Sequence, residues 1–72
     1  MKNYANLGGN SSIKYYEYET TFITVQFSSG KSYTYSYESA GINNVEHMKK
    51  LADSGSGLNS FIMRNVSQCY VK

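Results

Sequence analysis

Three tyrosines alternate with small polar residues in the stretch KSYTYSY at residues 31–37. Alternate side chains of an extended strand point to the same face of a sheet, so this spacing places three aromatic rings together. Rings on a sheet face hold unpaired bases in some RNA-binding modules. The same pattern also suits one wall of the core of a very small domain.

Basic side chains would supply the phosphate contacts of an RNA-binding module. Lys14 and Lys31 are expected to flank Phe27 across neighbouring strands, at one end of the sheet. If the basic groups share a side, they would follow a phosphate backbone; a solvated surface without a ligand is the alternative. The residues that we predict for such a nucleic-acid interface are Lys14, Lys31, Lys49, Lys50, Arg64, Tyr15 and Tyr37.

Few residues point to catalysis or metal binding. His47 lies on the charged side of a predicted helix, and no local signature joins it to Cys69 as base and nucleophile. One histidine and one cysteine do not supply the ligands of a zinc site. Residues 54–57 (SGSG) precede a helix but lack the Lys-Ser/Thr ending of a phosphate-binding loop, so we expect a connector. We therefore expect no catalytic residue, no metal and no cofactor.

Length and composition limit the class of protein. A chain of 72 residues forms one domain at most, and its net charge of +2 is too small to imply nucleic-acid binding by itself. The single cysteine excludes an intrachain disulfide and favours a reducing compartment. No apolar run approaches the roughly 18 residues of a membrane span, and the start does not resemble a signal peptide. We expect a cytoplasmic protein without a membrane partner.

The first part of the chain predicts a loose arm followed by strands. Residues 1–11 are polar and include two adjacent glycines, so we expect a flexible arm, with residues 12–72 forming the single domain. Aromatic and β-branched residues dominate the next segments, and proline is absent throughout. The predicted strands are Ile13 to Glu19, Phe22 to Phe27, and Lys31 to Tyr37.

The periodicity changes after the third strand. Ile42, Val45, Met48 and Leu51 recur at helical spacing, and Asn43 with Glu46 resembles a capping box. The SGSG segment would end this helix. A shorter helix is then predicted, with Asn59 as its N-cap and Leu58 and Met63 as a hydrophobic staple.

Residues 68–71 are expected as a short strand or coil. The resulting fold class is α+β: a three-stranded antiparallel β-meander followed by two short C-terminal α-helices packed on one face.

Loop length decides which face the tyrosines occupy. A two-residue loop at Ser29-Gly30 would separate Tyr33 and Tyr35 from the apolar residues of the second strand. A three-residue loop with Gly30 in the left-handed conformation sets Val25 opposite Tyr33 and Ile23 opposite Tyr35. The second register is consistent with a single apolar face, so we predict that both tyrosines lie mainly in the core.

Several short motifs occur in a distinctive order: Ser11-Ser12-Ile13, Ile23-x-Val25-x-Phe27, Gly30, Tyr33-Thr34-Tyr35, Ser54-x-x-Gly57-Leu58-Asn59-x-x-Ile62 and Tyr70. In this order they resemble the KTSC domain, a module at the C-terminus of some lysyl-tRNA synthetases that also occurs as small stand-alone bacterial and phage proteins. Three departures are Leu58, where the family has an aromatic residue, residues 38–41, where it usually has Val-Pro, and a first hairpin that is shorter than the family's. These departures concern the helix entry and the first turn.

The resemblance implies a mainly structural role for the motif residues Gly30, Tyr33, Tyr35, Gly57 and Asn59. It does not imply an activity, because none is established for the family; RNA binding has been suggested from the synthetase attachment. We expect a small non-enzymatic binding module with RNA or tRNA as its ligand. The alternative is a protein-interaction module, including a homodimer that pairs through an edge strand.

Overall fold

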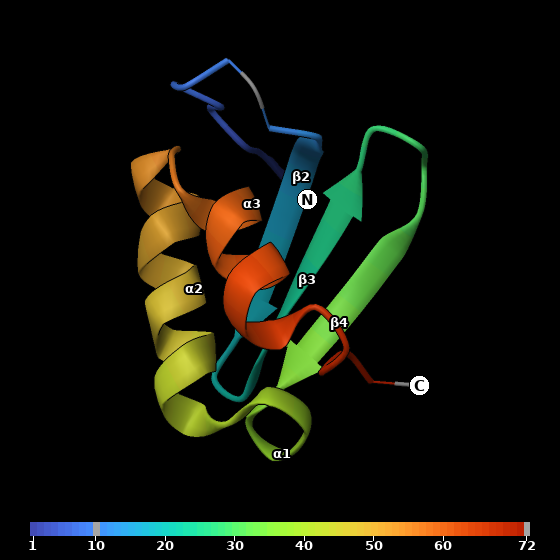
Figure 1. Cartoon of the computed structure of the whole chain (residues 1–72), viewed down its shortest axis with the longest axis vertical. Coiled ribbons are helices and arrows are strands. Elements are labelled where there is room, and N and C mark those ends of the chain that lie inside the picture. Colours follow the sequence, from blue (N-terminus) through green and yellow to red (C-terminus); the bar gives the residue numbers. More distant parts are fainter. Residues whose placement is uncertain (10, 72) are drawn as a thin grey trace.

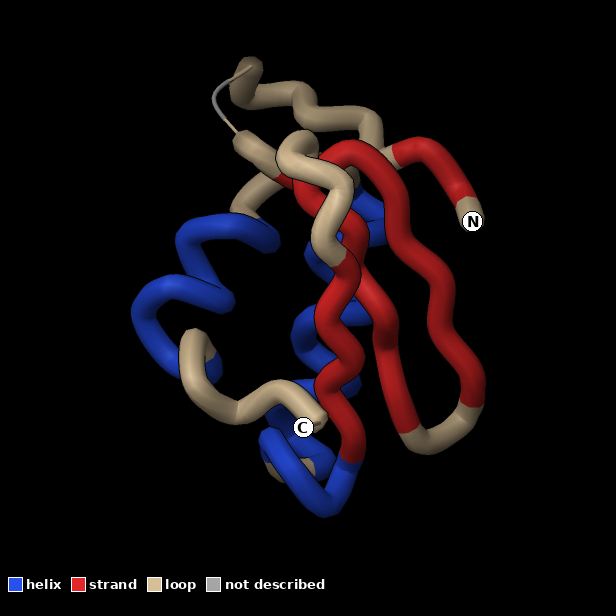
Figure 2. Tube along the Cα trace, turned by 90° about the vertical axis from the view of Figure 1, so that its right-hand side faces the viewer, coloured by secondary structure: helices blue, strands red, loops and turns tan. Residues whose placement is uncertain are grey.

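The computed structural model describes residues 1–9 and 11–71 and shows an antiparallel sheet with helices on one face (Figures 1 and 2). Residues 10 and 72, which belong to the predicted arm and the predicted domain, lie outside the described residues. No described helix is long and apolar enough to cross a membrane. In chain order the elements are β1 (Lys2–Asn3), β2 (Ile13–Glu19), β3 (Phe22–Phe27), β4 (Ser32–Ser36), α1 (Tyr37–Ala40), α2 (Ile42–Ser54), α3 (Leu58–Phe61) and the π-helix η1 (Ile62–Val66).

The α+β class is confirmed, but the sheet has four strands, in the order β1-β2-β3-β4, instead of the predicted three. The additional strand comes from residues predicted to be a loose arm, with Lys2 opposite Tyr16 and Asn3 opposite Tyr15. Burial of Tyr4 anchors it: this side chain is 6% exposed, and its hydroxyl accepts a hydrogen bond from the Leu58 N–H at 3.3 Å. The prediction of a loose arm is therefore wrong for residues 2–4.

The predicted register of the tyrosine strand is confirmed. Val25 lies opposite Tyr33, and Ile23 lies opposite Tyr35. Gly30 has a φ of 93° and donates its N–H to the Phe27 carbonyl at 2.9 Å, which closes the three-residue loop. Only glycine adopts this backbone conformation without strain, so Gly30 fixes which face of β4 meets the core.

Helix α2 packs its apolar side on the sheet through Val45, Met48 and Ala52, each at most 1% exposed. The predicted Asn43–Glu46 capping box is wrong, because Gly41 is the N-cap and makes no side-chain cap bond. A capping box does form one element earlier, between Ser36 and Ser39, where it starts the unpredicted helical turn α1.

The second helical segment begins two residues earlier than predicted, because its N-cap is Gly57 and not Asn59. Gly57 has the left-handed conformation, and Asn59 lies inside α3. Leu58 is fully buried, whereas Met63 is 65% exposed, so the predicted hydrophobic staple between them is wrong. The chain continues directly from α3 into η1, which sets Ile62 and Val66 against the core.

Replacing Tyr4 with alanine tests whether β1 is an integral part of the fold. We expect the free energy of unfolding to fall by about 3 kcal/mol, since a buried aromatic ring is lost. Leu7→Ala is the control, because Leu7 is 73% exposed. Urea denaturation followed by circular dichroism measures both variants, and equal small losses would show that the first strand contributes little.

Candidate functional site

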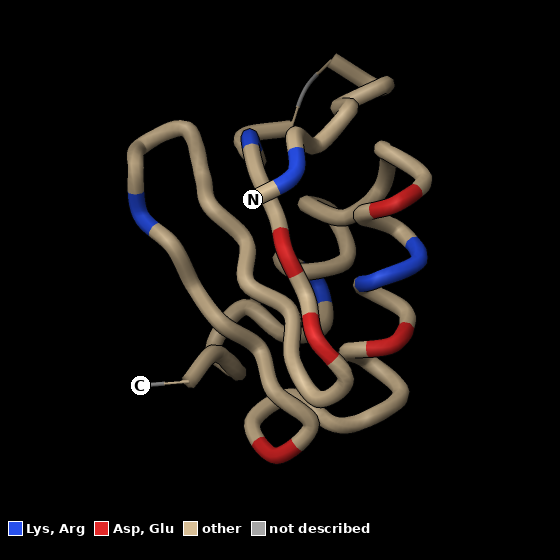
Figure 3. Tube along the Cα trace, turned by 180° about the vertical axis from the view of Figure 1, so that it is seen from behind, with Lys and Arg blue, Asp and Glu red and all other residues tan. Residues whose placement is uncertain are grey.

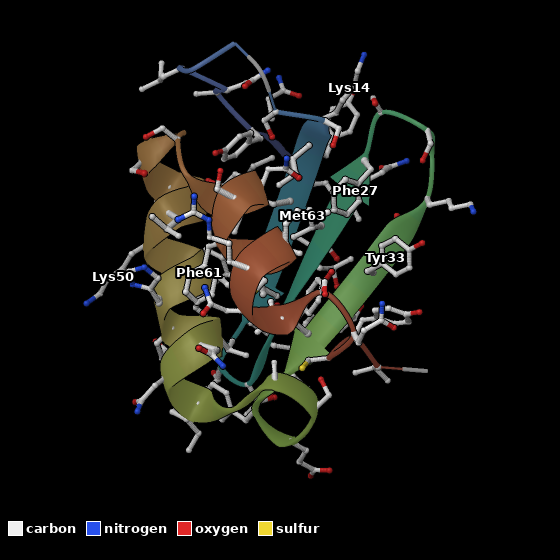
Figure 4. All side chains as sticks on the ribbon, in the orientation of Figure 1. Lys14, Phe27, Tyr33, Lys50, Phe61 and Met63 are labelled. Atoms are coloured by element: carbon white, nitrogen blue, oxygen red, sulfur yellow. The ribbon has the colours of Figure 1, made fainter. Side chains whose placement is uncertain are left out.

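An aromatic pocket of about 450 Å³ opens between the sheet and the C-terminal segment, within the range of small-ligand sites. Figure 4 shows Phe27 and Tyr33 on the sheet side of this space and Met63 on the η1 side. Its apolar lining consists of Phe27, Tyr33, Tyr35, Ile62, Met63 and Tyr70. Its polar lining consists of Ser12, Asn59, Ser67 and Gln68, so no lining residue is charged.

The rings of the pocket contact one another across two parts of the chain. The Tyr33 ring centroid lies 4.7 Å from that of Tyr70 and 5.8 Å from that of Phe27. The strand register places Tyr33, and the C-terminal segment places Tyr70. That segment is held to the edge of β4 by the Val71 N–H, which donates to the Thr34 carbonyl at 2.6 Å.

Tyr35 forms the most buried part of the lining, at 2% exposure. Every enclosed side-chain polar atom of the described residues has a hydrogen-bond partner. The Tyr35 hydroxyl has none among these residues, unlike the hydroxyls of Tyr16 and Tyr18. Its oxygen therefore retains some access, and the pocket that Tyr35 lines is where a partner would reach it.

Burial raises the pKa of Tyr35 to about 12, with smaller contributions from Tyr33 and Tyr70. The hydroxyl therefore keeps its proton at neutral pH and is available as a donor or an acceptor. Two carboxamides, those of Asn59 and Gln68, also border the pocket, and neither makes a side-chain hydrogen bond within residues 1–9 and 11–71. The pocket thus combines aromatic faces with uncharged groups that both donate and accept.

The π-helix η1 forms one side of the pocket. π-Helical turns are rare and occur frequently at functional sites. Here the wide turn holds Ile62 in the core while its neighbour Met63 stays at the rim.

Basic residues neighbour the pocket lining along the chain, although none of them lines the pocket. Lys31 lies opposite Phe27 and Arg64 lies on η1, whereas Lys14 belongs to β2, the strand that also carries Glu17 and Glu19. All acidic residues belong to β2, α1 and α2, as the red segments of Figure 3 show. These acidic residues are Glu17, Glu19, Glu38, Glu46 and Asp53.

The predicted nucleic-acid residues are not brought together. Lys14, Lys31, Lys50 and Arg64 are exposed, but Lys50 lies on the outer side of α2, away from Lys14 at the end of the sheet (Figure 4). Tyr15 is 39% exposed and lies on the face of the sheet that the helices leave open.

Lys49 and Tyr37 are occupied by contacts within the protein. The Lys49 ammonium pairs with Glu46 at 2.8 Å and donates to the Thr20 carbonyl at 2.8 Å, and its side chain is 13% exposed. Tyr37 is half-buried and donates its hydroxyl to the same Glu46 carboxylate. Hydrogen bonds from Lys49 and Tyr37 lower the pKa of Glu46. The two residues fasten α2 to the β2–β3 turn and to α1, so the expectation that they are accessible contacts is wrong.

The residues of the family-like motifs divide between structure and pocket. Gly30 and Gly57 both adopt positive φ, and Tyr35 belongs to the core. Tyr33 and Asn59 are half-buried and line the pocket.

The SGSG segment connects α2 to α3, as predicted. Gly55 ends α2 in the left-handed conformation, and a Cβ atom there would lie 2.6 Å from the Cβ of Ala5.

Sequence reasoning missed the roles of Phe27, Met63 and Gln68, and it noted Tyr70 only as a motif residue. Phe27 and Tyr70 are far apart in the sequence, so no periodic pattern links them. Both line the pocket because the C-terminal segment is held at β4 by the bond from Val71 to Thr34. The sequence signal for Met63 is that this apolar residue lies outside the apolar side of its helix, where a structural role in the core is not expected; the predicted staple with Leu58 assigned it such a role.

Within the described ranges, no group of three or more His, Cys, Asp or Glu side chains is arranged to hold a metal ion. Comparison of the chain with protein-family models, curated proteins and solved structures finds no significant match. The resemblance to the KTSC domain therefore stays a prediction from the motifs.

The raised pKa of Tyr35 gives a testable titration. The ultraviolet absorbance of phenolate should show a later step near pH 12, above the usual tyrosine value of about 10, for Tyr35 and for Tyr16, whose pKa is also raised by burial to about 12. Tyr35→Phe should remove part of this later step. A variant that leaves the later step unchanged would contradict the burial of this hydroxyl.

The same titration predicts a loss of stability in alkali. Unfolded tyrosines ionise near pH 10, whereas the folded Tyr35 holds its proton to about pH 12. The unfolded state therefore loses protons first, and stability falls as the pH rises from 10 to 12. Tyr35→Phe should flatten this fall in denaturation experiments across that range.

Proposed function

We propose that this protein is a small non-enzymatic module that binds single-stranded RNA, including the unpaired segments of tRNA, by holding an unstacked base in the aromatic pocket. The observation that carries the proposal is the pocket itself, which is lined by aromatic faces and uncharged polar groups and by no acidic residue. The function requires no catalytic group.

Stacking would supply much of the affinity. An exposed base loses contact with water when it packs on an aromatic ring, and each such base is worth about 1–3 kcal/mol by alanine substitution. Tyr33 and Tyr70 offer adjoining rings that are only half-buried, so part of each face remains available. Met63 at the rim adds a flexible apolar surface.

Charge would position the strand. Lys31 lies opposite Phe27 at the end of the sheet, and Lys14 follows Ile13, the residue that pairs with Phe27 from β2. From this end of the sheet, Lys31 would contact a phosphate beside the held base, and Lys14 would contact a phosphate farther along the strand. The open face of the sheet is a poorer surface for RNA, because Glu17 and Glu19 on β2 would repel phosphate there. The proposed RNA contact is therefore confined to one end of the domain, whereas the interface predicted from the sequence was spread over strands and helices.

The proposed ligand also suggests a cellular location, the cytoplasm. RNA and a cysteine kept reduced are both compatible with the cytoplasm, and Cys69 is a free, half-buried thiol. The KTSC-like motifs point the same way through the synthetase attachment of that family.

Lys31→Ala tests the phosphate contact, with Lys50→Ala as a control of equal charge change on α2. Fluorescence anisotropy of a labelled, unstructured oligoribonucleotide is measured between about 50 and 200 mM salt. We expect Lys31→Ala to weaken binding and to reduce the salt slope by about 0.7, the value for one phosphate of a single strand. Lys50→Ala should change neither.

Tyr33→Leu tests the stacking contact, and Tyr15→Leu is its control on the open face of the sheet. We expect Tyr33→Leu to weaken RNA binding by about tenfold, as the loss of one stacked base requires. Thermal unfolding confirms that each variant is folded. No binding of the wild type to any RNA at low salt, together with a dimer in sedimentation, would replace this proposal with the protein-interaction alternative.

A further inference from the structure

We propose that the aromatic pocket selects adenine, with the carboxamides of Asn59 and Gln68 and the hydroxyl of Tyr35 as the groups that read the base. This inference deepens the proposed function and rests on the same pocket, but it concerns which base the pocket takes. The ligand chemistry is an adenine ring that carries a phosphate, either within single-stranded RNA or as a free nucleotide.

The side-chain types of the lining favour adenine over the other bases. Carboxamides of Asn and Gln form paired hydrogen bonds with adenine, whereas guanine is read mainly by Arg or Lys and cytosine by Asp or Glu. The lining contains two carboxamides and none of the four charged residue types. An amide donates and accepts at once, which matches the adjacent donor and acceptor on an adenine edge.

The carboxamides are free to make these bonds. Two asparagine side chains of the neighbouring helices donate to backbone carbonyls: Asn44 of α2 to Ala40 at 2.7 Å and Asn65 of η1 to Phe61 at 3.2 Å. Asn43 of α2 makes no such bond within the described chain. Asn59 and Gln68 instead border the pocket from α3 and from the segment after η1, and their side chains bond to no described residue. An adenine between them would bond with groups that water otherwise satisfies.

The Tyr35 hydroxyl adds a third polar contact from deeper in the pocket. Its ring is almost wholly enclosed by the protein, and its oxygen has no described partner. The oxygen retains access through the pocket, so the hydroxyl is free to donate a hydrogen bond to a ligand nitrogen there. Adenine presents several such ring nitrogens and no carbonyl oxygen.

Ring size favours a purine as well. The walls are formed by the rings of Tyr33, Tyr70 and Phe27. The Tyr70 centroid lies 4.7 Å and the Phe27 centroid 5.8 Å from the Tyr33 centroid. The pocket volume of about 450 Å³ leaves room for a two-ring base, which covers more of these faces than a pyrimidine. Stacking on these rings favours a purine by its larger contact area but does not distinguish adenine from guanine, because both have the same two-ring face. The polar groups of the pocket would make that choice.

The test uses a short oligouridine with one central variable base, measured by fluorescence anisotropy on the full chain. We expect a central adenine to bind at least about tenfold more tightly than uracil, guanine or cytosine, because a good paired contact is worth about 1–3 kcal/mol. Equal affinities for all four bases, with the salt dependence retained, would overturn adenine selection and leave the RNA-binding proposal standing.

Variants locate the selectivity. Asn59→Leu and Gln68→Met keep the approximate side-chain size and remove the amides; each should reduce the adenine preference at least about threefold and leave the affinity for oligouridine unchanged. Asn43→Leu, an exposed amide on α2, is the matched control. Variants that unfold are recognised by circular dichroism, and Tyr35→Phe then serves as the conservative second variant. Full adenine preference in all folded pocket variants would overturn the assignment.

Titration with adenosine monophosphate separates the two sources of the ligand. Side-chain amide resonances of Asn59 and Gln68 should shift with adenosine monophosphate and not with uridine monophosphate. Shifts that saturate at a lower concentration of the mononucleotide than of the adenine-containing oligomer would identify a free nucleotide as the ligand, and would overturn the RNA proposal while supporting adenine selection. Absence of any amide shift with either adenine probe would overturn the inference.

Discussion

The three-residue turn at Gly30 sets the register between β3 and β4 and so decides which side of β4 packs against the helices. Its positive φ lets the chain return with Val25 opposite Tyr33 and Ile23 opposite Tyr35. A loop one residue shorter would turn every side chain of β4 to the other face. The helices would then cover serine and threonine, and the apolar face of the sheet would lose the ring of Tyr35.

The fold was largely predictable because its decisive signals are local. Glycine in a short loop, the two-residue period of β2 and β3 and the helical period of α2 each act over a few residues. β1 carries no such signal: two residues pair with β2 only because Tyr4 finds a buried site beside Tyr16 and Leu58. A strand that tertiary packing creates cannot be recognised from its own composition.

The site was less predictable for the same reason. Exposure of a lysine on a helix depends on what the helix faces, and Lys49 happens to face the rings of Tyr18 and Tyr37, 5.4 and 5.5 Å away. Its stem is buried and its charge is compensated by Glu46, so it strengthens the packing of α2 on the sheet. The pocket likewise exists only because the C-terminal segment returns to the edge of β4.

Hydroxyl partners divide the six tyrosines other than Tyr4 and Tyr15 into two groups. Tyr16 and Tyr18 donate to Asp53 and lower the pKa of that carboxyl, and Tyr37 donates to Glu46, so these rings join the sheet to α1 and α2. Tyr33, Tyr35 and Tyr70 make no such bond among the described residues, although one of them is almost fully buried. Every enclosed side-chain polar atom of the described residues has a partner, so these three hydroxyls are open to solvent or to a bound molecule. Because all three belong to residues that line one pocket, that pocket is the place where the proposed ligand would meet them.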